Sequence, residues 1–112
     1  MTDPHRAAAR LVEDFLEASM KPDPVRARTF MAADVAITFT GGRRMSDPAE
    51  STAFNAKRYA FVKKRFERTD VAPGAAEGET VVYNIGTLYG AWPDGTPFEG
   101  NRYVDRFEIR DG

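Results

Sequence analysis

Residues 79–110, ETVVYNIGTLYGAWPDGTPFEGNRYVDRFEIR, decide the fold of this chain. The stretch predicts two long strands joined by the turn PDGT at 93–96, because Asp-Gly is a strong signal for a tight hairpin turn. Successive side chains of a strand point to opposite faces. The second strand therefore gathers its charged residues on one face, and we expect the other face to meet the core. The row expected to face the core consists of Tyr103, Asp105, Phe107 and Ile109.

Asp105 is the member of that row that points to chemistry. A carboxylate among apolar side chains has to be paired, protonated or placed at the wall of a cavity. At a cavity wall it can act as a general acid or base, so Asp105 is the candidate catalytic residue. Two alternatives without catalysis stand beside this one: pairing with an arginine, or a strand of reversed phase that turns Asp105 to solvent. A symmetric hairpin centred on Asp94-Gly95 sets Asp105 opposite Asn84, whereas a one-residue slip sets Tyr83 or Ile85 there.

Length and composition describe one small domain, residues 1–112, with enough apolar residues for a core: 42% are hydrophobic and 12% aromatic. The net charge of −1 lacks the basic surplus of nucleic-acid binding proteins. Cysteine is absent and there is one histidine, so we expect no metal site and no cofactor. The chain shows no signal-peptide pattern and no apolar run of about 18 residues. We therefore expect a cytoplasmic protein without a membrane partner.

The rest of the chain predicts helices and strands in the order α-α-β-α-β-β-β. A helix is expected from Thr2 or Asp3 to Lys21, and a short helix from Asp23-Pro24 to Phe30 or Met31. A strand over 35–40 and a loop over 42–51 follow. A third helix is expected from Thr52 to Arg65 or Phe66, and then a short strand over 67–72. Gly86, Gly90 and Gly100 lie inside strand patterns, where glycine commonly marks a bulge or bend. The expected fold class is α+β: a curved antiparallel sheet, three helices on one face, and an open-ended cone.

The chain ends at Asp111-Gly112, a second hairpin-turn signal. We expect the natural protein to continue with a further strand, which this chain lacks.

Two segments carry a resemblance to a known family: LVEDFLEA at 11–18 and GAWPDGTPFEGNRYVDRFEIRDG at 90–112. They resemble the nuclear transport factor two-like superfamily, and within it the SnoaL-like and polyketide-cyclase-like small proteins. The resemblance implies a cone-shaped α+β barrel with a hydrophobic pocket, a homodimer formed through the sheet, and a final strand after the Arg110-Asp111-Gly112 turn. The superfamily includes ketosteroid isomerase and scytalone dehydratase, and also proteins without catalysis.

The resemblance also places individual residues. Asp105 falls where ketosteroid isomerase carries its oxyanion-hole aspartic acid. Phe15 and Phe39 fall near the positions of that enzyme's tyrosine and general base, so steroid isomerase activity is not expected. The dehydratase members use a His-Asp pair, and the single histidine, His5, is a poor match for that role.

These observations lead to two hypotheses of different classes. The first is a protein that binds a small hydrophobic or polycyclic ligand, with cofactor-free isomerase, dehydratase or cyclase chemistry at Asp105 if it is an enzyme. The second is a non-catalytic dimeric binding or assembly module whose cone is filled by its own side chains. The residues expected to shape the ligand pocket are Phe15, Phe39, Tyr59, Asn84, Trp92 and Tyr103.

Overall fold

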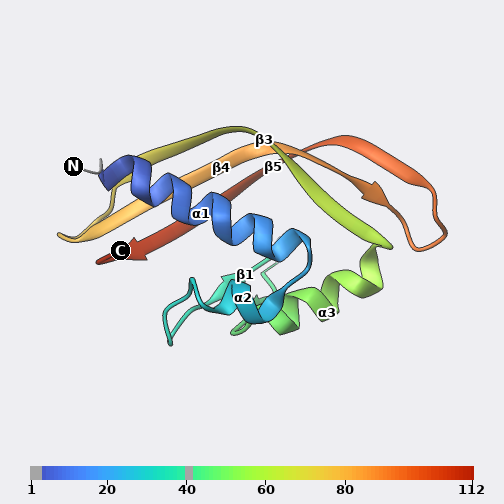
Figure 1. Ribbon diagram of the computed structural model, residues 1–112, viewed down its shortest axis with the longest axis horizontal. Helices are drawn as coiled ribbons and strands as arrows, with labels where there is room; N and C mark the ends of the chain where they lie inside the picture. The colour runs from blue at the N-terminus through green and yellow to red at the C-terminus, as the bar shows by residue number, and fades with distance from the viewer. Residues whose placement is uncertain (1–3, 40–41) are drawn as a thin grey trace.

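The computed structural model describes residues 4–39 and 42–112, which form an α+β arrangement of helices and antiparallel strands (Figure 1). The elements are α1 (Pro4–Met20), α2 (Pro24–Arg28), β1 (Ile37–Thr38), β2 (Arg44–Met45), α3 (Pro48–Arg58), β3 (Phe61–Pro73), β4 (Glu79–Ala91) and β5 (Pro97–Arg110). Strands β3, β4 and β5 form one antiparallel sheet, and β1 pairs with β2 in a separate one. The predicted fold class is confirmed, whereas the open-ended cone stays a prediction.

Helix α1 lies across one face of the three-stranded sheet, where it contacts β3 and β4 (Figure 1). Its apolar residues recur at helical spacing, and Ala8, Val12 and Leu16 are buried against Val82 of β4. The predicted first helix is confirmed, and its apolar stripe faces the sheet. Because β4 is the central strand, this packing buries the middle of the sheet on the side that carries Asp105.

The two shorter helices begin where capping residues precede a proline. Asp23 accepts a hydrogen bond from the backbone N–H of Arg26 at 3.1 Å, and Pro24 is the first residue of α2. Asp47 accepts one from Ala49 at 2.8 Å, and α3 follows. Helix α3 therefore starts four residues before the predicted Thr52.

The predicted end of the third helix, at Arg65 or Phe66, is wrong. Helix α3 ends at Arg58, and residues 61–73 form strand β3, which pairs with β4 over its whole length. The predicted short strand over 67–72 is the second half of β3. The sequence 61–66 shows helical spacing of Phe61, Val62 and Phe66, but the hydrogen bonds to β4 outweigh that local preference.

The predicted strand over 35–40 is shorter in the structure, and the predicted loop over 42–51 is partly regular. Strand β1 covers Ile37–Thr38 and pairs with β2, which lies inside that loop. Thr40, the predicted end of the strand, lies outside the described residues. The element order therefore contains one strand more than predicted.

The hairpin of β4 and β5 brings Asp105 opposite Asn84, as predicted for a symmetric hairpin. Near the turn the pairing is offset by one residue, since Ala91 pairs with Pro97. A bulge restores the register: Leu88 pairs with Asn101 and Tyr89 with Glu99, so that Gly100 between them has no partner. Gly100 has φ +84, a conformation that side chains disfavour. A glycine at this position therefore sets which residue faces Asp105.

The predicted faces of β5 are confirmed. The row of Tyr103, Asp105, Phe107 and Ile109 is half-buried. The alternate residues from Arg102 to Glu108 are exposed. Among the described residues, no helix is long and apolar enough to span a membrane.

Candidate functional site

Asp105 forms an ion pair with Lys64 on the half-buried face of the sheet. The Lys64 ammonium donates to Asp105 Oδ2, and the two side chains are 23% and 32% exposed. Lys64 lies on β3 and Asp105 on β5, so the pair spans the central strand β4. Two opposite charges thus sit beside the core with part of each still open to solvent.

A row of polar residues runs across all three strands beside this pair. Asn84 of β4 pairs with Thr69 of β3 on one side and with Asp105 of β5 on the other. Asn84 is fully buried at 0% exposure. A buried amide has to find hydrogen-bond partners to offset its lost hydration, and Asn84 finds them in two neighbouring side chains.

A chain of three hydrogen bonds runs through Asn84. The Tyr103 hydroxyl donates to Asn84 Oδ1 at 2.5 Å, and Asn84 Nδ2 donates to Thr69 Oγ1 at 3.0 Å. The Thr69 hydroxyl donates to Glu13 Oε2 of helix α1 at 3.0 Å. The chain therefore joins the sheet to the helix that covers it and holds Tyr103 in one orientation.

Gly86 makes room for Tyr103, with which it is paired. A Cβ atom at Gly86 would lie 3.1 Å from the Tyr103 hydroxyl and 2.0 Å from the carbonyl oxygen of Arg65. The second distance is far too short for any side chain. The close approach of β3 and the position of the phenol thus both depend on a glycine here.

The surroundings of Tyr103 keep its phenol protonated. Burial, the Asp105 carboxylate and the Glu67 carboxylate together raise the pKa of Tyr103 to about 12. The Lys64 ammonium lies 4.9 Å from the centroid of the tyrosine ring, within cation–π range. Tyr103 is thus a neutral hydrogen-bonding group at neutral pH.

The six residues expected to shape a pocket lie in separate places. Asn84 and Tyr103 contact each other beside Asp105. Phe15 packs edge-on against Phe107, with ring centroids 5.9 Å apart, as part of the core. Phe39 packs against Phe54 at 5.6 Å. Their roles toward a ligand stay predictions.

Tyr59 and Trp92 belong to a third group near the hairpin turn. Their rings stack at 5.5 Å, and Trp92 also stacks on Phe98 at 4.5 Å. Trp92 is 41% exposed. This aromatic cluster therefore offers a partly open apolar surface at the end of the hairpin.

Lys64, Thr69 and Glu13 belong to the site but were not predicted. Lys64 falls inside the helix predicted to end at Arg65 or Phe66; as a strand residue it lies on the inner face beside Val62 and Phe66. A period of two over 62, 64 and 66 is the signal that marks this face, but a lysine in the middle of it obscures the apolar pattern. Arg102 and Arg106 do not pair with Asp105; they form ion pairs with Glu67 and Glu108.

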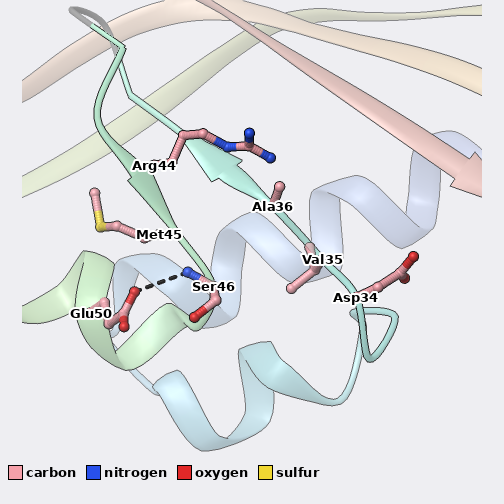
Figure 2. A pocket seen from close by; sticks show the side chains of 7 residues that line it. All are labelled: Asp34, Val35, Ala36, Arg44, Met45, Ser46 and Glu50. Atoms are coloured by element: carbon pink, nitrogen blue, oxygen red, sulfur yellow. Dashed lines mark hydrogen bonds between the residues drawn. The ribbon is translucent and has the colours of Figure 1, made fainter.

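Asp105 lines neither of two surface hollows found among the described residues. One, of about 360 Å³, is lined by Asp34, Val35, Ala36, Arg44, Met45, Ser46 and Glu50 (Figure 2). Its polar wall includes the backbone N–H of Ser46, which donates to Glu50 at 2.9 Å. The other, of about 510 Å³, is lined by His5, Arg6, Ala9, Thr69, Asp70 and Val71. Neither has the apolar lining that was expected of a pocket for a flat hydrophobic ligand.

Within the described residues, no three His, Cys, Asp or Glu side chains are grouped so that they could hold a metal ion. The groups that the site brings together are a carboxylate, an ammonium and an oriented phenol.

The fold is shared with solved structures. A protein from Xanthomonas campestris pv. campestris assigned as a polyketide cyclase matches with a TM-score of 0.63 and 18% identity, over 98% of this chain and 86% of the other. A protein from Novosphingobium aromaticivorans DSM 12444 assigned as a scytalone dehydratase matches with a TM-score of 0.61 and 9% identity, over 94% of this chain and 85% of the other. A second protein assigned as a polyketide cyclase, from Pseudomonas putida KT2440, matches with a TM-score of 0.51 and 21% identity, over 90% of this chain and 77% of the other.

At these identities the likeness shows the fold alone. No match to a curated protein was found. The sequence profile of the SnoaL-like domain matches residues 12–112, which is most of the chain and includes the second half of α1, the whole three-stranded sheet and the Lys64–Asp105 pair. With its fold and its sequence in agreement, this chain belongs to the SnoaL-like domain family.

Proposed function

We propose that the protein binds a small apolar or polycyclic molecule against the sheet face that carries Asp105, and that Asp105 moves a proton there without a cofactor. The observation that carries the proposal is the half-buried ion pair of Asp105 and Lys64. A carboxylate can accept the proton next to a carbonyl group, and an ammonium can stabilise the negative oxygen that results. The pair thus combines the two charges that isomerisation, dehydration or aldol-type cyclisation requires.

In the proposed step, the Asp105 carboxylate takes a proton from carbon while the Lys64 ammonium hydrogen-bonds to the carbonyl oxygen. The carbon–hydrogen electron pair moves into the enolate, whose negative oxygen the ammonium faces. Asp105 then returns the proton to carbon or to a leaving hydroxyl. No electron acceptor is needed, so no cofactor has to take part.

Apolar residues next to the pair support a hydrophobic ligand. Phe66 precedes the β3 bulge on the same face, and Phe107 follows Asp105 by two residues. The stacked rings of Tyr59 and Trp92 lie near the hairpin turn, away from the pair, and form a separate aromatic surface. The names of the similar structures, polyketide cyclase and scytalone dehydratase, also favour a cyclase- or dehydratase-type reaction.

The experiment is proton exchange on a bicyclic ketone. We expect the protein to accelerate hydrogen–deuterium exchange of 2-tetralone in D₂O above the rate in buffer, as followed by NMR. Asp105→Asn should remove about 10²–10⁴-fold of that acceleration, the range of general acid–base catalysis. The matched control is Asp70→Asn, because Asp70 lies on β3 and pairs with Arg68 in solvent.

Equal exchange rates with wild-type protein, the Asp105 variant and buffer alone would contradict the catalytic proposal. Binding of 2-tetralone by wild-type protein, measured as a rise in melting temperature, separates a ligand-binding protein from one that binds nothing at this face.

The second candidate function is a non-catalytic dimeric binding or assembly module. Two observations favour it: each charge of the Lys64–Asp105 pair already has a partner, and Val104 on the opposite sheet face is 63% exposed. Val104 pairs with Ile85, so an apolar strip lies in the middle of that face. Sedimentation velocity tests this candidate. A monomer at all concentrations contradicts it, and a dimer that leaves 2-tetralone unbound and unexchanged supports it over the enzyme.

A further inference from the structure

We infer that Glu13 sets the hydrogen-bond polarity of the ligand face: through Thr69 and Asn84 it makes Tyr103 an acceptor toward any ligand, so the site selects molecules that carry a hydroxyl donor. The inference rests on the proposed ligand site and adds the class of ligand group that Tyr103 takes. Glu13 is here a positioning residue, three hydrogen bonds away from the ligand face.

The polarity starts at Glu13, because a carboxylate can only accept hydrogen bonds. Thr69 lies 3.0 Å from Glu13 Oε2 and has one hydroxyl proton. That proton is needed by the carboxylate, so toward Asn84 the Thr69 oxygen can only accept. This step follows from the proton count of the two groups alone.

The orientation of the Asn84 amide depends on Thr69 and in turn decides which way the hydrogen bond to Tyr103 runs. With an acceptor at Thr69, the amide has to turn its NH₂ group there, and the Nδ2–Oγ1 distance is 3.0 Å. Its carbonyl oxygen then points to Tyr103, 2.5 Å from the phenol oxygen. Because Asn84 is fully buried, no water competes for either end of the amide.

The consequence falls on Tyr103. Its one proton is donated to Asn84, and its raised pKa of about 12 keeps that proton in place at neutral pH. Any further hydrogen bond to the phenol oxygen must come from a donor on the ligand. The neighbouring Lys64 ammonium offers the opposite polarity and suits a carbonyl oxygen. A ligand that bears both a hydroxyl and a carbonyl group therefore matches this face.

The polarity can be tested without any ligand. The Raman doublet of the tyrosine ring differs between a phenol that donates a hydrogen bond and one that accepts it, and the Tyr103→Phe spectrum isolates the contribution of this residue. We expect a donor signature for Tyr103 in wild-type protein. In Glu13→Gln the side-chain amide can itself donate to Thr69, so the amide of Asn84 is free to turn and the signature should move toward an acceptor.

Two further variants control this measurement. Glu17→Gln makes the same change of charge on an exposed position of α1 and should leave the doublet unchanged. Thr69→Val cuts the chain between Glu13 and Asn84 at nearly constant volume and should reproduce the effect of Glu13→Gln. An unchanged Tyr103 signature in both Glu13→Gln and Thr69→Val would overturn the inference.

Ligand selectivity is measured with 6-hydroxy-1-tetralone and its methyl ether, 6-methoxy-1-tetralone, which lacks the donor. We expect wild-type protein to bind the hydroxyl compound about tenfold more tightly, the effect of one unpaired polar group. Glu13→Gln should reduce that preference to about threefold or less, and Glu17→Gln should keep it. Equal affinities in wild-type protein overturn the selectivity. A Raman shift without binding of either ketone would instead refute the ligand site and leave the polarity of the chain intact.

Discussion

Replacing Asn84 by leucine should destabilise the protein because the change leaves the Tyr103 hydroxyl without its acceptor. Leucine has nearly the shape of asparagine, so the buried position is filled and little cavity forms. The hydroxyl of Tyr103 loses the 2.5 Å bond to Asn84 Oδ1, while Thr69 keeps its bond to Glu13. Because Tyr103 is only half-buried, its hydroxyl can bond water instead, so the change costs the two lost hydrogen bonds, about 1 kcal/mol each. We therefore expect Asn84→Leu to lower the unfolding free energy by about 2 kcal/mol.

The double variant gives the sharper result. Tyr103→Phe alone leaves the fully buried Asn84 Oδ1 unpaired and should cost about 1–3 kcal/mol. In the Asn84→Leu background the same change removes the stranded hydroxyl and should cost little or nothing. The two variants should thus show a favourable coupling of about 1–3 kcal/mol, as expected for residues in direct contact.

Urea denaturation, followed by the fluorescence of the single tryptophan, measures all four proteins. Domains of this size are stable by about 5–15 kcal/mol, so the variants should stay folded in water. Val104→Ala, at an exposed position of β5, serves as the control for a simple loss of side chain. Strictly additive costs for Asn84→Leu and Tyr103→Phe would refute the reasoning, because they would show that the two side chains do not depend on each other.

Two other predictions follow from the same part of the sheet. The pKa of Tyr103 is raised from 10.0 to about 12, so the folded state holds the phenol proton more tightly than the unfolded state does. The contribution of Tyr103 to the unfolding free energy should therefore be constant below pH 10 and be lost between pH 10 and 12. Tyr103→Phe should lack this pH-dependent loss of stability. A fall of the same size in both proteins would contradict the burial of the phenol. Gly86→Ala should cost about 3 kcal/mol or more in urea denaturation, because its Cβ would lie 2.0 Å from the Arg65 carbonyl oxygen. Gly95→Ala, in open space at the turn, should cost only the strain of its positive φ, about 1 kcal/mol, and equal costs for the two would argue against a backbone clash at Gly86.

The sequence was sufficient for the features of the hairpin that depend on neighbouring residues. Asp94-Gly95 predicts the turn, and the alternation along 97–110 predicts that Asp105 lies on the half-buried face, as the structure confirms. The helical stripe of α1 was equally readable, because Ala8, Val12 and Leu16 recur at the period of a helix. A period of two or of 3.6 residues is a property of the local chain and needs no partner to be seen.

Only the tertiary structure decided what surrounds Asp105. Residues 61–66 have the composition of a helix end, and they become a strand because β4 offers them a row of backbone hydrogen bonds. That change turns Lys64 toward Asp105, 41 residues away in the chain. Glu13 reaches Thr69 only because α1 crosses the sheet at that point. The partner of a charged or polar side chain depends on the registers of two strand pairs and on where a helix crosses them. Neither the registers nor the crossing point can be predicted from the local sequence. The chain by itself therefore determined where the candidate carboxylate lies, whereas its packing chose the lysine, the amide and the phenol that define its chemistry.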